Sequence, residues 1–166
     1  MISLIAALDG NFLIGNKNRL PWHYKEDLNF FKQKTFNKDV LMGFKTYESL
    51  KQYYKKKSFP FKNVYIASLK RNKKNKLSDG IIINDLKKFV QNYFDKGKNI
   101  IIIGGSQIYK FILPYTNIMY LTHVLRRHDG DSFFPNFNYN DFFIKEKKVV
   151  DSLIFVTYIS IKNKIL

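Results

Sequence analysis

Residues 2–8 form a nearly continuous apolar run, and this run constrains the fold more than any other feature of the sequence. A strand with alternating polar and apolar residues has one face in water, whereas a strand that is apolar at almost every position needs cover on both faces. Strands of this kind lie at the centre of parallel sheets that helices cover on both sides. We therefore expect an α/β fold in which residues 2–8 form a central strand.

Strand and helix patterns alternate along the rest of the chain. Apolar side chains at positions 86, 89, 90 and 93 recur at helical spacing, and Gly97 follows them as a helix end. Such alternation favours parallel strands joined by helices, with ligands bound at the carboxyl ends of the strands. We expect further strands at residues 40–42, 62–68, 81–83, 100–103, 119–122, 142–149 and 153–161, the last two as an antiparallel hairpin, and helices at residues 26–35, from 45 or 46, at 86–93 and at 106–113.

Length and composition favour a single domain, which we place at residues 1–166. With 166 residues and 45% hydrophobic composition, the chain can bury one sizeable core. No apolar run reaches membrane-spanning length and no basic flank precedes residues 2–8, so we expect a cytoplasmic monomer without a membrane partner. The absence of cysteine excludes disulfides and thiol catalysis. Because His23, His123 and His128 show no metal-ligand spacing, we expect no metal.

The formal net charge of +16 raises nucleic-acid binding as a rival function. The 29 basic residues include only four arginines, and the lysines are spread along the chain except for local runs at residues 55–57 and 70–76. The chain is also rich in Asn, Ile, Phe and Tyr, a composition typical of codons that drift towards A and T. We therefore expect a solvated basic surface and no specific nucleic-acid partner.

Asp27 lies in residues 20–31, a stretch that also contains the single tryptophan of the chain, Trp22. The acidic pair Glu26 and Asp27 suits the first turn of a helix. On this helix Asp27 and Phe31 are four residues apart, so the carboxylate shares a face with apolar side chains. One interpretation is that Asp27 only complements the helix dipole. The other is a recessed acid whose pKa suits proton chemistry or the binding of an amidine-like ligand edge.

The segment at residues 9–24 is too long for an ordinary turn. Loops of this length in compact domains tend to be lids or binding loops. Gly10, Gly15 and several asparagines suit a mobile cover. We therefore expect a lid over a ligand site.

Several motifs, taken in order and at their spacing, closely resemble the dihydrofolate reductase family. They lie at residues 1–8, 13–22, 27–31, 40–50, 102–109, 120–123 and 130–135. The resemblance covers nearly the whole chain. It implies a single-domain fold with a mostly parallel central sheet, an antiparallel C-terminal hairpin and helices on both faces. It also implies the NADPH-dependent reduction of 7,8-dihydrofolate to 5,6,7,8-tetrahydrofolate, by hydride transfer from the nicotinamide to the pterin and protonation at N5.

The resemblance implies that Asp27 is the only ionisable side chain in the pterin pocket, where it binds the 2-amino group and N3. Thr122 would support Asp27 from behind, Trp22 would position a water near the pterin, and Leu20 would belong to the closing lid. The substrate-binding positions implied are Ile5, Ala6, Ala7, Leu28, Phe31, Leu50, Lys62, Ile103 and Tyr109. Without the resemblance, Thr122 is an ordinary β-branched strand residue and the apolar positions are core.

A strand followed by glycine and a helix start occurs at Gly43 and again at residues 104–106. This arrangement places free backbone N–H groups and the positive end of a helix dipole where an anionic cofactor can bind. The resemblance implies NADPH, a cis peptide between the two glycines of residues 104–106, and a 2′-phosphate site at Ser68 with Lys70 or Arg71. The cofactor-binding positions implied are Ala7, Ile14, Asn18, Gly43, Lys45, Thr46, Ser49, Ser68, Lys70, Arg71, Gly104, Gly105, Ser106, Gln107 and Ile108.

The chain departs from the family pattern where basic residues bind anions. Phe44 and Gln107 stand where the family usually has basic residues near the cofactor. Phe61 stands where the family has the arginine that binds the glutamate carboxylate of folate, and Lys62 is the candidate substitute, although an ammonium lacks the bidentate geometry of a guanidinium. Phe61 leaves open a different pterin substrate without the glutamate tail. A second alternative substrate is a pyrimidine like that of the related riboflavin-pathway reductases, against which Trp22 and Asp27 argue. The third alternative is a non-catalytic basic module that binds nucleic acid.

Overall fold

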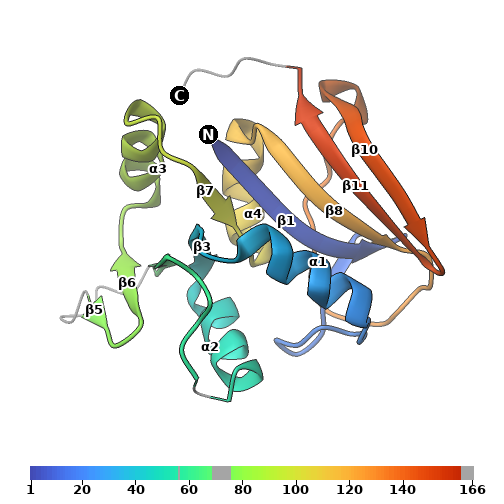
Figure 1. Ribbon diagram of the computed structural model, residues 1–166, viewed down its shortest axis with the longest axis horizontal. Helices are drawn as coiled ribbons and strands as arrows, with labels where there is room; N and C mark the ends of the chain where they lie inside the picture. Colours follow the sequence, from blue (N-terminus) through green and yellow to red (C-terminus); the bar gives the residue numbers. More distant parts are fainter. Residues whose placement is uncertain (56, 69–75, 162–166) are drawn as a thin grey trace.

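The computed structural model describes residues 1–55, 57–68 and 76–161, which form a nine-stranded sheet with helices on both faces (Figure 1). The strand order is β10-β11-β8-β1-β7-β3-β4-β6-β5. Pairing is parallel from β8 through β1, β7, β3 and β4 to β6, and antiparallel where β10, β11 and β5 join. The strands are β1 (Ile2–Asp9), β3 (Asp39–Gly43), β4 (Asn63–Ala67), β5 (Lys76–Leu77), β6 (Gly80–Ile83), β7 (Ile100–Ile102), β8 (Ile118–Val124), β10 (Phe142–Val150) and β11 (Leu153–Ser160).

Strand β1 contributes side chains to separate hydrophobic layers on the two sides of the sheet. Leu4 and Leu8 belong to a cluster with α3 (Leu86–Asp95) and α4 (Ser106–Ile112). Ile5 belongs to a second cluster that packs against α1 (Lys25–Thr35) and α2 (Phe44–Tyr53). Successive side chains of a strand point to opposite faces, so the apolar run supplies both layers. The expected α/β fold with a central first strand is confirmed.

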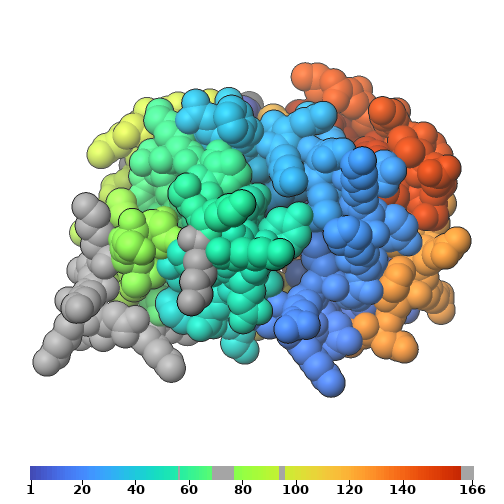
Figure 2. Space-filling model, turned by 60° about the horizontal axis from the view of Figure 1, so that its bottom comes forward, coloured from blue at the N-terminus to red at the C-terminus, as the bar shows by residue number. Residues whose placement is uncertain are grey.

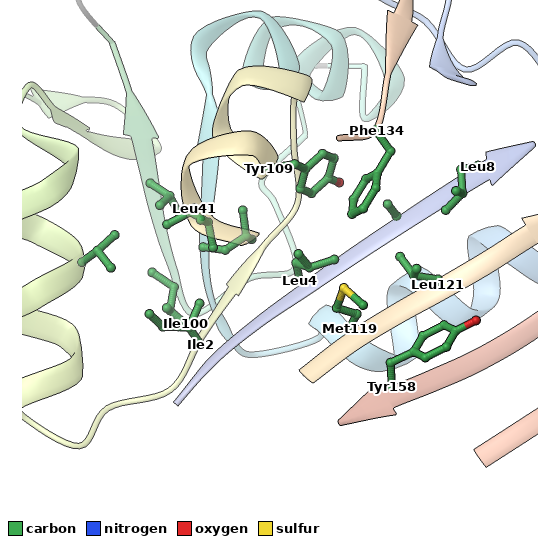
Figure 3. Close-up of a cluster of buried hydrophobic side chains, with 14 of the residues drawn as sticks. Ile2, Leu4, Leu8, Leu41, Ile100, Tyr109, Met119, Leu121, Phe134 and Tyr158 are labelled. Atoms are coloured by element: carbon green, nitrogen blue, oxygen red, sulfur yellow. The ribbon is translucent and has the colours of Figure 1, made fainter. Parts of the chain in front are cut away.

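Figure 3 shows the first of these layers, in which side chains from β1, β7 and β8 pack beneath α4. Leu4, Ile102 and Met119 have no solvent-exposed surface. Tyr109 of α4 lies against Phe134, with ring centroids 5.0 Å apart. This packing fixes α4, and with it the glycine turn that precedes the helix, against the end of β7.

The predicted long strands and the four helices are confirmed, with boundaries that shift by one or two residues at most ends. Three short strands were not predicted: β5, β2 (Leu13–Gly15) and β9 (Ser132–Phe133). β2 and β9 pair with one another although more than a hundred residues separate them in the sequence, so no local pattern predicts them. The segment expected to be a lid loop therefore contains a strand. Pro114 lies within a 3₁₀ turn, Leu113–Tyr115, and a second such turn spans Tyr139–Asp141.

Strand β10 forms one edge of the sheet, and nearly all of its residues are exposed. Apolar Phe143, Ile144 and Val149 on this edge strand are interspersed with lysines. No helix in the part of the chain that the structure describes is long and apolar enough to cross a membrane.

A buried and an exposed isoleucine of the sheet provide a test of how much the core stabilises the fold. Ile102 is 0% exposed on β7, whereas Ile81 is 42% exposed on β6. Ile102→Ala should lower the free energy of unfolding by about 2–5 kcal/mol, because it removes buried methyl groups and leaves a cavity. Ile81→Ala makes the same chemical change in a strand and should cost less than about 1 kcal/mol. Urea unfolding of both variants checks this, and equal losses would contradict the assigned core.

Candidate active site

A cleft of about 810 Å³ opens between α1, α2 and the segment that precedes α1, beside the carboxyl ends of β1 and β7. Figure 2 shows the surface on which α2, in teal, meets α1 and the preceding segment, in blue. The predicted site residues that line this cleft are Ile5, Ala6, Ala7, Ile14, Asn18, Leu20, Trp22, Asp27, Leu28, Phe31, Thr46, Ser49, Leu50, Ile103, Gly104, Gly105 and Tyr109. Residues far apart in the sequence thus share one cavity.

Asp27 lies in the first turn of α1 and points into the cleft, with only 8% of its surface exposed. Burial raises the pKa of Asp27 above its ordinary value, and a hydrogen bond with Thr122 acts in the opposite direction. Among the described residues that line the cleft, Asp27 is the only acidic one. A residue that served only the helix dipole could remain in water, so the geometry favours the recessed acid.

Thr122 and Trp22 flank the carboxylate. Thr122 lies on β8, paired in register with Ala7 of β1, and is almost completely buried behind Asp27. Trp22 lines the cleft, and its indole Nε1 is buried without a hydrogen-bond partner in the described part of the protein. Because buried N–H groups are nearly always paired, this donor is available to a molecule in the cleft.

The walls beside Asp27 form an apolar slot. β1, α1, α2 and the end of β7 supply its side chains, which are Ile5, Ala7, Leu28, Phe31, Leu50 and Ile103. The buried hydroxyl of Tyr109 donates a hydrogen bond of 2.6 Å to the carbonyl of Ile5, and burial raises the pKa of Tyr109. An apolar slot with a few directed polar groups is the usual form of a small-molecule site.

Gly104 and Gly105 line the other end of the cleft, and two helices start at glycines there. Gly43 precedes α2 and Gly105 precedes α4, and neither N-terminus has a side-chain cap. The peptide between Gly104 and Gly105 is cis, as the family resemblance implies, and Gly43 N–H donates to the Gly104 carbonyl at 2.8 Å. A Cβ at Gly105 would lie 3.2 Å from Thr46 Oγ1. In the described part of the chain, this bare backbone at helix starts without side-chain caps fits a dinucleotide pyrophosphate.

Other predicted positions lie outside the cleft lining. Thr122, Gly43, Lys45, Lys62, Ser68, Ser106, Gln107 and Ile108 are not among the lining residues, and Lys70 and Arg71 fall outside the described residues. Ser106 Oγ donates to the Phe133 carbonyl at 2.6 Å, so this hydroxyl joins α4 to β9.

Lys62 is exposed, and its backbone N–H bonds to the Lys38 carbonyl. Its neighbour Phe61 stacks on Phe59 and meets Phe31 edge to face, at centroid distances of 5.6 and 6.3 Å. The aromatic packing of Phe61 occupies this wall beside Phe31. The prediction that Lys62 lines the substrate pocket is not supported by its position.

Several lining residues were not predicted from the sequence. They are Gly15, Arg19, Pro21, His23, Lys32, Gln52, Tyr53, Tyr54 and Ser132. Tyr53 and Tyr54 lie four residues after Ser49 and Leu50, at the end of α2 and at its C-cap, so helical periodicity could have placed them on the same side as these residues. Lys32 follows Phe31 on α1 and adds a cation at the cleft. Ser132 lies on β9, which only the long-range pairing with β2 brings to the cleft.

The fold and the cleft together fit the class of α/β enzymes that bind a nucleotide cofactor beside a small-molecule substrate. The glycine-preceded helix starts suit the phosphates of a cofactor, and the apolar slot around Asp27 suits a ligand with a hydrogen-bonding edge.

Comparisons with known proteins specify this class further. The family model for dihydrofolate reductase matches residues 1–154. The dihydrofolate reductase of Buchnera aphidicola subsp. Acyrthosiphon pisum (strain APS) is 44% identical over 138 residues, which are 82% of this chain and 80% of that protein. The enzyme of Haemophilus influenzae is 34% identical over 143 residues, 86% and 84% of the two chains. The chain belongs to the dihydrofolate reductase family.

A solved structure agrees with this assignment. Dihydrofolate reductase from Enterococcus faecalis, complexed with NADP(H) and RAB-propyl, matches with a TM-score of 0.83 and 25% sequence identity. The match covers 98% of this chain and 97% of that chain.

The buried carboxylate predicts a pH-dependent stability. Because folding raises the pKa of Asp27, the folded protein binds more protons than the unfolded chain between the two pKa values. The contribution of Asp27 to the free energy of unfolding therefore falls as pH rises from about 4, the unfolded value, through the folded pKa. Asp27→Asn removes this charge, so its stability relative to wild type should increase from pH 4 to pH 7.

Urea unfolding of the ligand-free protein across this pH range measures the difference. Asp129→Asn changes an exposed carboxylate and should track wild type at every pH. A constant difference between Asp27→Asn and wild type would show that burial does not penalise this charge.

Proposed function

We propose that this cleft reduces 7,8-dihydrofolate to 5,6,7,8-tetrahydrofolate with NADPH, and that Asp27 holds the pterin. The observation that carries the assignment of Asp27 is its burial as the sole acidic side chain lining the described cleft. A carboxylate accepts two parallel N–H bonds from the 2-amino group and N3 of a pterin, and enclosure by apolar side chains strengthens them. Thr122 steadies the carboxylate from the side of the sheet.

The bound cofactor supplies the hydride, and the residues of the chain bind, orient and protonate the substrate. The apolar slot would hold the flat pterin ring with its edge toward Asp27. Because burial raises the pKa of Asp27, the site can hold a proton closer to neutral pH than an exposed aspartate can. The free Nε1 donor of Trp22 positions a water that passes the proton to N5. Leu20, which is 51% exposed, closes over the ligands and excludes bulk water.

The cofactor is held by backbone groups more than by charge. The first-turn N–H groups of α2, with Thr46 and the exposed Lys45, bind the pyrophosphate from one side. Gly104 and Gly105 allow the backbone to approach it from the other. The assignment of the 2′-phosphate to Ser68 with Lys70 or Arg71 remains a prediction, because both basic residues lie outside the described part of the chain.

Lys32 is a better candidate than Lys62 for the carboxylate of the glutamate tail. Lys32 lines the cleft next to Phe31, whereas Lys62 does not line it. Lys32 is exposed, so its attraction for a carboxylate is screened by water. With Phe61 in place of a guanidinium, a dihydropterin without a glutamate tail is the second candidate substrate.

We further propose that the chain is a single domain that acts as a cytoplasmic monomer without a specific nucleic-acid partner. The continuous sheet, which includes strands from both ends of the chain, supports one domain. The spread of lysines along the chain supports a solvated basic surface.

Asp27→Asn should lower turnover of dihydrofolate by about 10²–10⁴-fold, the usual contribution of general acid–base assistance. The amide retains the size of the side chain, but it has one oxygen in place of two, so it cannot accept two parallel N–H bonds, and it cannot take up a proton. Steady-state assays with NADPH measure the loss, and circular dichroism checks that the variant is folded. Asp129→Asn is the matched control. Wild-type turnover by a folded Asp27→Asn protein would remove Asp27 from the proposed mechanism.

Lys32→Ala should raise KM for dihydrofolate about two- to fivefold, since an exposed ion pair contributes up to about 1 kcal/mol. Phe61→Arg should lower KM by about tenfold, because a guanidinium can bind the carboxylate with two charge-assisted bonds. In both variants kcat should change little.

Lys62→Ala is the control for Lys32→Ala and should leave KM unchanged. A tail-free dihydropterin should be insensitive to all three substitutions. A rise in KM for dihydrofolate with Lys62→Ala alone would show that Lys62, and not Lys32, binds the carboxylate of the glutamate tail. No response from any variant would favour the tail-free substrate.

A further inference from the structure

Asp9, at the carboxyl end of β1, is a buried carboxylate outside the cleft lining. Only 3% of its surface is exposed. Its Oδ1 accepts the backbone N–H groups of Asn11 and Leu13 at 2.9 and 3.1 Å, and its Oδ2 accepts the backbone N–H of His128 at 3.0 Å. One side chain therefore joins the start of the lid segment to a segment almost 120 residues away. Hydrogen bonds from N–H groups to a charged acceptor are among the stronger ones in proteins.

Both segments that Asp9 binds contain a residue that packs with Trp22. The ring of His128 lies against the indole of Trp22, with centroids 5.1 Å apart and ring planes at 63°. Leu13, whose N–H is bound by the other oxygen of Asp9, packs in the same hydrophobic cluster as Trp22. Leu13 also begins β2, which continues to the cleft-lining Ile14 and Gly15. Asp9 thus fixes two of the surfaces that hold the indole.

Other contacts join the two segments at different backbone groups. β2 pairs with β9, and the carboxylate of Asp131 accepts the backbone N–H of Lys17. These contacts hold the tip of the lid segment near β9. They bind neither the backbone of His128 nor the N–H of Leu13.

We propose that Asp9 is a positioning residue that sets the orientation of Trp22, and through it the water donor at the pterin. This proposal rests on the proposed function for its kinetic consequence. Its structural consequence, the placement of the Trp22 indole, stands independently of the substrate.

Two substitutions separate the oxygens of Asp9. Asp9→Ala removes both acceptors and frees all three N–H groups. Asp9→Asn retains one carbonyl oxygen, which can serve Asn11 and Leu13, while its amide NH₂ faces the N–H of His128 and cannot accept it. Asp9→Asn therefore breaks the link to His128 selectively and is the milder change. Asp129→Asn, an exposed carboxylate next to His128 in sequence, is the matched control.

Trp22 is the only tryptophan of the chain, so tryptophan fluorescence of the ligand-free protein reports its surroundings alone. We expect the emission maximum to move to longer wavelength in Asp9→Ala and by a smaller shift in Asp9→Asn, because the 8% exposed indole gains contact with water. We expect kcat for dihydrofolate to fall about ten- to a hundredfold in Asp9→Ala, with a smaller change in KM, as for a misplaced group near the reacting atoms.

All measurements are made well below the unfolding midpoint of each variant. A lower midpoint in Asp9→Ala with unchanged emission and kcat would mean that Asp9 only stabilises the fold, and it would overturn the proposal. Should Asp9→Ala fail to fold, unchanged emission and kcat in Asp9→Asn would overturn it equally. If wild type does not turn over dihydrofolate, the proposed function fails, while the fluorescence of the variants still decides whether Asp9 positions Trp22.

Discussion

Strand β1 has a parallel neighbour on each edge and a hydrophobic layer on each face. The rest of the structure depends on these contacts on all sides of β1. Its pairing with β7 sets the position of the glycine turn, Gly104 and Gly105, at one end of the cleft. Its pairing with β8 sets Thr122 behind Asp27. Since a shift of one residue would turn every side chain of β1 to the opposite face, the register that buries the core also assembles the site.

The site contains a carboxylate, Asp27, whose charged form is destabilised by folding. Burial of Asp27 penalises its charged form, and a hydrogen bond with Thr122 offsets this penalty only in part, because the pKa of Asp27 remains raised. A pterin edge would complete the hydrogen bonding of this group. The same desolvation that lowers the stability of the ligand-free protein therefore favours ligand binding, a conflict that is common where function requires a strained or unpaired group.

The sequence was sufficient to predict the long strands, the four helices and the burial of Asp27 among apolar side chains, because each depends on local apolar spacing or on residues close in the chain. It was insufficient for β2 and β9, whose pairing joins residues that have no local strand pattern. The assignment of Lys62 to the substrate stays a prediction, although Lys62 does not line the cleft. Whether a loop side chain enters a cleft depends on its neighbours, here the packing of Phe61 on Phe59 and Phe31, and the irregular segment after α2 has no periodicity from which that packing can be predicted.

The lysines of the exposed edge strand β10 have a further effect, on association between copies of the chain. A nine-residue edge with unpaired backbone groups and exposed Phe143, Ile144 and Val149 is a template on which another chain could add a strand and begin an aggregate. Lys145, Lys147 and Lys148 interrupt this apolar surface, and a second copy aligned along the edge would bring like charges together. The lysines of β10 therefore act as gatekeeper residues that oppose edge-to-edge pairing, at a distance in the sheet order from the strands that line the cleft.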